Sequence, residues 1–421
     1  MVQPSTKQIS ERARVFMLFA FFFCIITAFW TLKPLRTSSV VKALGPEYYP
    51  LVKQGSLVFI PLVMFFYFSM TCYLTRSRLI YLFTGIFIAL TGLFWLLFLG
   101  EPSTWVKVGF FYYVDTYITV MVALFWTYVN SSFDAASAKK HFAFIGAGGI
   151  VGGILGASIA GSLSTILQND IILVSGLFLF LIFPIVSWLE RGREFEDVAQ
   201  NPVCKSPGKS GWESYTEGIR MISGSRYLLS LLLIVGLYEV VSTVIDFQFN
   251  FSCDAAFDDA FSMASFQGNV FSVANTLSLI VMLGVAPIIL RKFDIKVALM
   301  FLPGLLLLGS AAFLLFPLLW VITLTIGGEM SFAYSINQAS REALWSPLGK
   351  VEKFKTKAFI DMFVFRFAKT LGSAVTLIYA LVLVPKGVGT WVLMLLNLGL
   401  IGTWLVAVLN ASRLFEQKQS N

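Results

Sequence analysis

Residues 337–373 read NQASREALWSPLGKVEKFKTKAFIDMFVFRFAKTLGS and join a cation-rich polar run to a long apolar run. The apolar run, 358–384, is long enough to cross a lipid bilayer as a helix. It nevertheless carries Asp361, Arg366 and Lys369. A charge near the middle of a bilayer costs about 2.5–3.5 kcal/mol, so such residues normally face a polar cavity and indicate a functional site. The rest of the chain must supply that cavity.

The composition of the 421-residue chain extends this interpretation to the whole molecule. Hydrophobic residues make up 57% and charged residues 13%, which is typical of a polytopic membrane protein rather than of several soluble domains. A net charge of +8 would also suit a nucleic-acid partner, but the cations lie in short loops between apolar segments, so we expect none. The first apolar segment runs into TLKPLR without a small-residue cleavage site, and we interpret it as an uncleaved span.

Apolar segments of spanning length recur about twelve times along the chain. They lie at 13–34, 51–75, 79–100, 105–132, 142–167, 171–190, 227–249, 263–290, 295–317, 318–344, 358–384 and 387–412. The sequence therefore predicts an all-α polytopic membrane protein. Its predicted parts are an N-terminal six-helix half at 1–190, a cytoplasmic linker at 191–226 and a C-terminal six-helix half at 227–421.

A weak internal repeat supports this division. FWTYVNSSFDAASAKKHFAFIG near 125–146 and AYSINQASREALWSPLGKVEKFKTKAFID near 333–361 both pass from an aromatic span, through an Asn and a charged loop, into an aromatic-flanked segment. An even number of spans separates them, so the two halves run in the same direction. Two parallel six-helix halves are typical of major-facilitator transporters, whose substrate site lies near mid-membrane between the halves.

The loop charges predict the orientation of the chain. Cations gather in alternate loops, so both termini are expected in the cytoplasm. One group breaks the pattern, because Lys33, Arg36, Lys42 and Lys53 cluster at the outer end of the first two spans. Lys42 and Lys53 either extend to the lipid head groups or face the cavity, and both interpretations stay open. For Lys33 and Arg36 we favour the cavity.

The stretch GAGGIVGGILGASIAG at 146–161 resembles a phosphate-binding loop, but its context favours another role. No predicted strand precedes it, and no acidic partner follows it. Gly148, Gly152 and Gly156 are four residues apart, as are Gly149 and Gly153. Such stripes of small residues are typical of close packing between transmembrane helices.

Three further acids, Asp115, Glu239 and Asp246, lie in apolar surroundings. Each either serves a site or pairs with hydroxyl groups of a neighbouring helix for packing alone, and Asp115 has the further possibility of lying near the end of its span. His141, beside two lysines in an expected solvated loop, is the only histidine. Since a two-histidine metal site and a Ser/His/Asp grouping rooted in a buried histidine are both excluded, we expect no metal, no cofactor and no enzymatic activity.

Taken together, TLKPLRTSSVVKALG at 31–45, the Glu239 helix and residues 337–373 resemble the ATP/ADP translocase family of intracellular bacteria and plastids. The resemblance covers nearly the whole chain and implies exchange of nucleotides. Glu239 and Lys369 match that family's acid of the seventh span and its late basic residue directly, and Arg366 precedes the latter.

Two other family positions match with altered side chains. The family's basic pair at the end of the first span corresponds to Lys33 and Arg36, where the second residue is usually Lys. Its acid of the fourth span corresponds to Asp115, where Glu is usual. The resemblance thus implies a cationic, phosphate-binding surface of Lys33, Arg36, Arg366 and Lys369, neutralised by Asp115 and Glu239 when empty.

The sequence therefore predicts an exchanger of anionic nucleotides in a lipid bilayer, with the protein partners undefined. One alternative keeps the fold and changes the substrate to another organic anion, with proton coupling through Glu239. The other alternative is a membrane-embedded enzyme or a scaffold, which the absence of a catalytic cluster in the sequence disfavours.

Overall fold

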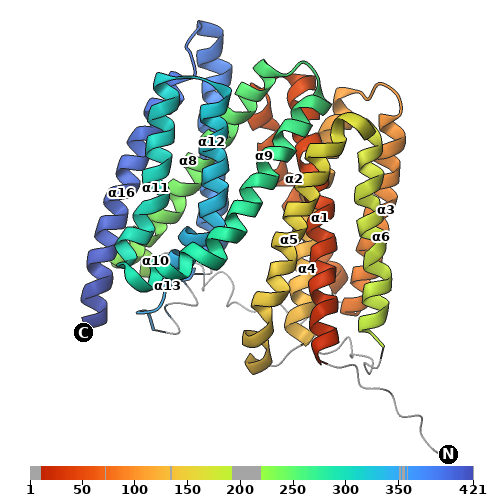
Figure 1. Cartoon of the computed structure of the whole chain (residues 1–421), viewed down its shortest axis with the longest axis horizontal. Coiled ribbons are helices and arrows are strands. Elements are labelled where there is room, and N and C mark those ends of the chain that lie inside the picture. Colours follow the sequence, from red (N-terminus) through yellow and green to blue (C-terminus); the bar gives the residue numbers. More distant parts are fainter. Residues whose placement is uncertain are drawn as a thin grey trace, which may run out of the picture. The chain divides into compact units, whose positions relative to one another are not determined.

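The computed structural model describes residues 11–71, 73–132, 135–191, 220–349, 352, 356–357 and 359–420. Within these ranges all regular structure is helical (Figure 1). This agrees with the physics of a bilayer, where backbone polar groups must find their partners inside the protein and a helix satisfies them within one segment.

The first part of the chain forms six long helices. They are α1 (Glu11–Leu44), α2 (Tyr49–Thr71), α3 (Arg76–Phe98), α4 (Thr104–Ser132), α5 (Ala135–Leu167) and α6 (Ile171–Leu189), with the 3₁₀ turn η1 (Gln168–Asp170) between the last two. His141 lies in α5, where its Nε2 is 2.8 Å from Glu11 Oε1, so the expectation of a solvated loop at this residue was wrong.

The second part of the chain also forms helices, and short π segments interrupt several of them. In chain order they are α8 (Arg226–Ala256), α9 (Ala260–Ile280), η4 (Val281–Val285), α10 (Ala286–Lys292), α11 (Ile295–Leu315), α12 (Leu319–Phe332), η5 (Ala333–Asn337), α13 (Gln338–Ala343), η6 (Ile360–Val364), α15 (Phe365–Ile378), η7 (Tyr379–Leu383), η8 (Val384–Lys386) and α16 (Trp391–Ser420). All of η4, η5, η6 and η7 are π-helical.

Among the described residues, 11 helical stretches are long and apolar enough to cross a membrane. One of them, His141–Leu189, contains most of α5 and the whole of α6. When α5 and α6 are counted separately, the number is twelve, which agrees with the about twelve spans predicted from the apolar segments.

The chain forms two compact units, which do not follow the order of the sequence strictly. Unit 1 comprises Met1–Ala43, Ser56–Ser206 and Asp259–Ser272, and unit 2 comprises Leu44–Gly55, Pro207–Asp258 and Val273–Asn421. The start of α2 thus belongs to unit 2, and the first part of α9 belongs to unit 1. The division into halves at 1–190 and 227–421 stays a prediction, and most of the expected linker lies outside the described residues.

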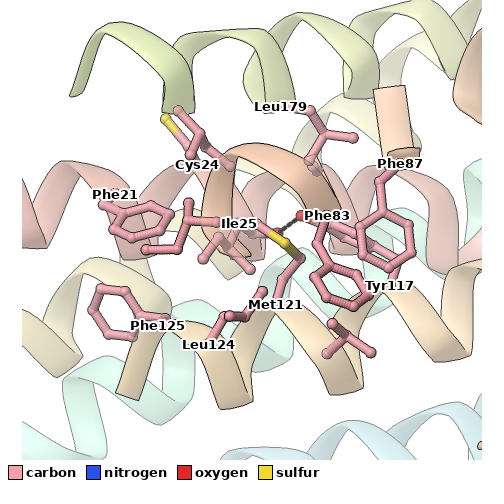
Figure 2. Packing of buried hydrophobic residues seen from close by; sticks show 14 of the residues in the cluster. Phe21, Cys24, Ile25, Phe83, Phe87, Tyr117, Met121, Leu124, Phe125 and Leu179 are labelled. Atoms are coloured by element: carbon pink, nitrogen blue, oxygen red, sulfur yellow. Dashed lines mark hydrogen bonds between the residues drawn. The ribbon is translucent and has the colours of Figure 1, made fainter. Parts of the chain in front are cut away.

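Aromatic packing holds α1 against α4 within unit 1. The rings of Phe21 and Phe125 meet edge to face with centroids 5.2 Å apart. The Tyr117 hydroxyl donates to the Ile25 carbonyl oxygen at 2.6 Å, a bond between the same two helices (Figure 2). Lipid tails are as apolar as these side chains, so shape-matched van der Waals contact and such polar bonds stabilise the helix pair.

The glycine stripe of α5 packs on α1, which lies alongside it in Figure 1. A Cβ atom added at Gly148 would lie 2.5 Å from the Phe19 carbonyl oxygen, and one added at Gly152 would lie 2.6 Å from that of Phe23. Gly156 faces the next turn of α1 in the same way. The predicted packing role of this stripe is confirmed.

Candidate functional site

The first charged cluster lies in unit 1, where Arg36 of α1 forms an ion pair with Asp115 of α4. The guanidinium carbon of Arg36 also lies 4.6 Å from the ring centroid of Phe111. Only 9% of the arginine side chain and 20% of the aspartate side chain are exposed. Asp115 lies well inside α4, so the interpretation that places it near the end of a span was wrong.

Asp115 uses both of its carboxylate oxygens. Oδ1 faces Arg36, and Oδ2 accepts a hydrogen bond of 2.9 Å from the hydroxyl of Ser56 in α2. One carboxylate therefore joins three helices, and it balances the largely buried charge of Arg36.

Lys33, one helical turn before Arg36, has different neighbours. Its Nζ lies 4.0 Å from the ring centroid of Trp30 and 4.6 Å from that of Phe271 in α9. Cation–π contact of this kind stabilises an ammonium group by about 0.5–2 kcal/mol, more as it is withdrawn from water. Lys33 thus contacts two aromatic rings, and Arg36 contacts both an aromatic ring and the Asp115 carboxylate.

The second cluster lies in unit 2, where Lys369 Nζ of α15 is 3.7 Å from Glu239 Oε2 of α8. Only 3% of the Glu239 side chain is exposed. Gly372 sets the approach of the two helices, because a Cβ atom at this position would lie 2.8 Å from Thr243 Cβ. Gly372 and Thr243 lie one turn beyond the two charged residues, so the glycine in the AKTLGS stretch brings the lysine within reach of the acid.

Glu329 of α12 belongs to the same unit, and the sequence interpretation missed it. Its Oε1 accepts hydrogen bonds from the Tyr238 hydroxyl at 2.6 Å and the Ser242 hydroxyl at 3.0 Å. Tyr238 directly precedes Glu239 in α8, and both acids, Glu239 and Glu329, are buried. The position of Glu329 within the apolar segment 318–344 was the signal that could have identified this residue.

A third ion pair joins the start of α2 to α8 within unit 2. Lys53 Nζ lies 2.8 Å from Asp246 Oδ2, and both side chains are about one-third exposed. Lys53 is thus bound to an acid inside the protein, which neither interpretation of its outer position anticipated.

Arg366 is the predicted site residue with the least structural support. It lies on the exposed side of α15, and the described parts of the chain offer it no ion-pair partner within 4.0 Å. It therefore stays a prediction, as does the joining of the cations of units 1 and 2 into one surface. Among the described residues, no group of three or more His, Cys, Asp or Glu is placed to hold a metal ion.

Comparison with solved structures tests the fold class. The chain is similar to the POT family transporter PepTSo, at a TM-score of 0.64 and 14% identity over 98% of this chain and 99% of that one. It is also similar to the nucleoside transporter NupG, at a TM-score of 0.60 and 14% identity over 98% of this chain and 100% of that one. The predicted all-α polytopic fold class is therefore confirmed.

Sequence comparison then gives the family. The model of the TLC ATP/ADP transporter family matches residues 103–326. The chain therefore belongs to this family, and the protein is a multi-pass membrane transporter. It is 21% identical to ADP,ATP carrier protein 1 of Chlamydia pneumoniae, over 96% of this chain and 92% of the relative. It is 23% identical to the protein of the same name from Chlamydia trachomatis, over 96% and 89%. The relatives are carriers, so the predicted absence of enzymatic activity agrees with the family.

Proposed function

We propose that the protein exchanges anionic nucleotides, ATP against ADP, by alternating access around a cationic site. One observation carries the proposal: each unit holds a cation inside a membrane span against an acid, Arg36 with Asp115 and Lys369 with Glu239. Cations at this depth are costly and are normally retained for function. Phosphate oxygens bind Arg bidentately and Lys as a point charge, so a nucleotide competes with the two acids for their partners.

The names of the relatives support the same substrate class, because they are ADP,ATP carriers that align with nearly the whole chain. We propose Lys33, Arg36, Asp115, Glu239, Arg366 and Lys369 as the substrate-binding residues. In this scheme the acids neutralise the cations in the empty protein, and the substrate phosphates take the place of the acids during transport.

Counterflow into proteoliposomes tests the proposal. Vesicles loaded with unlabelled ATP should take up external labelled ADP in a saturable way, whereas vesicles loaded with buffer alone should take up little. Lys386 is exposed at the end of η8 and belongs to no proposed site, so a Lys386→Gln variant should exchange like the wild type and serves as the control for charge removal. Equal uptake by ATP-loaded and empty vesicles would refute exchange, and uptake of other organic anions in place of nucleotides would refute the substrate.

A second function, proton-coupled transport of another organic anion, is favoured by one observation. Glu239 and Glu329 are two nearly buried acids of unit 2, and Lys369 forms an ion pair with the first of them. A carboxyl group that is withdrawn from water readily holds a proton. An acid-outside pH gradient that drives uptake into empty vesicles, and a protonophore that abolishes it, would establish this function instead of exchange.

The orientation belongs to the proposal as well. We propose that the protein lies in a bacterial inner membrane with both termini and the linker 191–226 in the cytoplasm, because the loop cations follow that side. Ser206, which lies outside the described residues, offers a labelling position. A Ser206→Cys variant should react with an impermeant thiol reagent in inverted vesicles. Reaction in intact cells would show that the orientation is the opposite one.

A further inference from the structure

Ser56 makes an unusual hydrogen bond for a serine in a membrane helix. Such hydroxyls commonly bond back to the carbonyl four residues earlier in their own helix. Ser69, in the same helix α2, does this and donates to the Phe65 carbonyl oxygen at 2.9 Å. Ser56 instead donates across to Asp115 Oδ2 at 2.9 Å, and only 7% of the residue is exposed.

The bond matters because Asp115 is also the partner of Arg36. While the site is empty, the carboxylate is neutralised by the guanidinium on Oδ1 and held by the hydroxyl on Oδ2. When Arg36 turns to a substrate phosphate, Asp115 loses its cation and keeps a largely buried negative charge. A hydroxyl that donates to a carboxylate stabilises its charged form, so the Ser56 bond lowers the cost of that step.

We propose that Ser56 is a positioning residue of the anion site: its hydroxyl holds the Asp115 carboxylate in place so that Arg36 can leave it for a substrate phosphate. Ser56 itself does not touch the substrate in this scheme. The inference rests on the proposed nucleotide exchange for its substrate, but its residues and contacts all lie within unit 1.

The test measures ADP/ATP counterflow with purified Ser56→Ala in proteoliposomes. Without the hydroxyl, Arg36 stays longer on Asp115, so KM should rise about tenfold, which corresponds to about 1.4 kcal/mol, while the maximal rate stays within about twofold. Ser56→Thr keeps a hydroxyl and should retain most of the affinity. Ser69→Ala, on the same helix, is the matched control and should leave KM unchanged.

A double-mutant cycle separates positioning from a general packing defect. In an Asp115→Asn background the carboxylate charge is absent, so adding Ser56→Ala should change KM no further. A rise in KM of the same size in both backgrounds, or an unchanged KM in Ser56→Ala alone, would overturn the inference. If the wild-type protein exchanges no nucleotide, the proposed function fails first, and that result is distinct from wild-type exchange that is indifferent to Ser56.

Discussion

Replacement of Lys369 by Gln perturbs the charged cluster of unit 2 at its cation. Lys369 Nζ and Glu239 Oε2 are 3.7 Å apart, and two unit charges at this distance attract by about 4.5 kcal/mol at an effective dielectric constant of about 20. The lysine side chain is 53% exposed, so solvent screens much of this attraction. We therefore expect Lys369→Gln to lose about 1–3 kcal/mol of stability, less than the roughly 3–5 kcal/mol typical of breaking a fully buried pair.

Two measurements on the same purified variants separate a structural role from a substrate role. Thermal unfolding in detergent reports stability, and ATP/ADP counterflow in proteoliposomes reports transport. Adding Glu239→Gln to Lys369→Gln removes the stranded acid, so the double variant should regain most of the lost stability. Its exchange should stay at least about tenfold below wild type, because the charge that binds phosphate is still absent. Lys369→Arg keeps the charge and should retain part of the activity.

If the double variant recovers both stability and near-normal exchange, Lys369 serves only to neutralise Glu239 and does not bind the substrate. Near-normal exchange by Lys369→Gln alone leads to the same conclusion. An unchanged melting temperature in the single variant would instead show that the ion pair contributes nothing to the empty protein.

Three further predictions concern stability. Gly152→Leu should sharply lower the folded yield, since a side chain there meets the backbone of α1, whereas Gly146→Ala on the same helix has open space and should be silent in a thermal-unfolding assay. Gly372→Val should separate α15 from α8 and reduce both stability and exchange, and normal values for both would show that the close approach is dispensable. Asp259 accepts hydrogen bonds from the Phe261 and Ser262 backbone N–H groups at the start of α9, and Asp259→Ala should cost about 1 kcal/mol. Hydrogen bonding from Ser262, chiefly from its side chain, lowers the pKa of Asp259, so this contribution should be present above the ordinary aspartate pKa and be lost as the pH falls through the lowered value, as melting curves against pH can check.

The helices could be predicted from the sequence because the bilayer leaves few choices. A long apolar segment must form a helix to satisfy its backbone, so the number of spans follows from the apolar segments alone. The packing role of Gly152 was predictable for a similar reason, since spacing by four residues places small side chains on one face. The π segments were not predictable, because they depend on a local change in backbone bonding that hydropathy does not register.

The candidate site was predictable in its charges but not in its pairings. The sequence indicated Arg36, Asp115, Glu239 and Lys369 as membrane-embedded ions, yet which acid meets which cation depends on the rotation of each helix about its own axis. The Lys53–Asp246 pair spans 193 residues of sequence, and no local pattern encodes it. Glu329 was overlooked beside the conspicuous cations of the next segment, although the rule that identified Glu239 applied to it equally.

The assignment of Asp259–Ser272 to unit 1 has a consequence for biosynthesis. Gly161 of α5 packs against Gly268 and Asn269, so part of the surface of unit 1 is made by residues that leave the ribosome more than one hundred positions later. Membrane domains are generally completed in the order in which they are translated. Here the end of α5 around Gly161 has to wait without its partner until α8 and the start of α9 have been inserted. A nascent chain arrested in the linker should therefore expose this end of α5 to proteases or chaperones, and the two sequence halves expressed from separate genes should each require the other to mature.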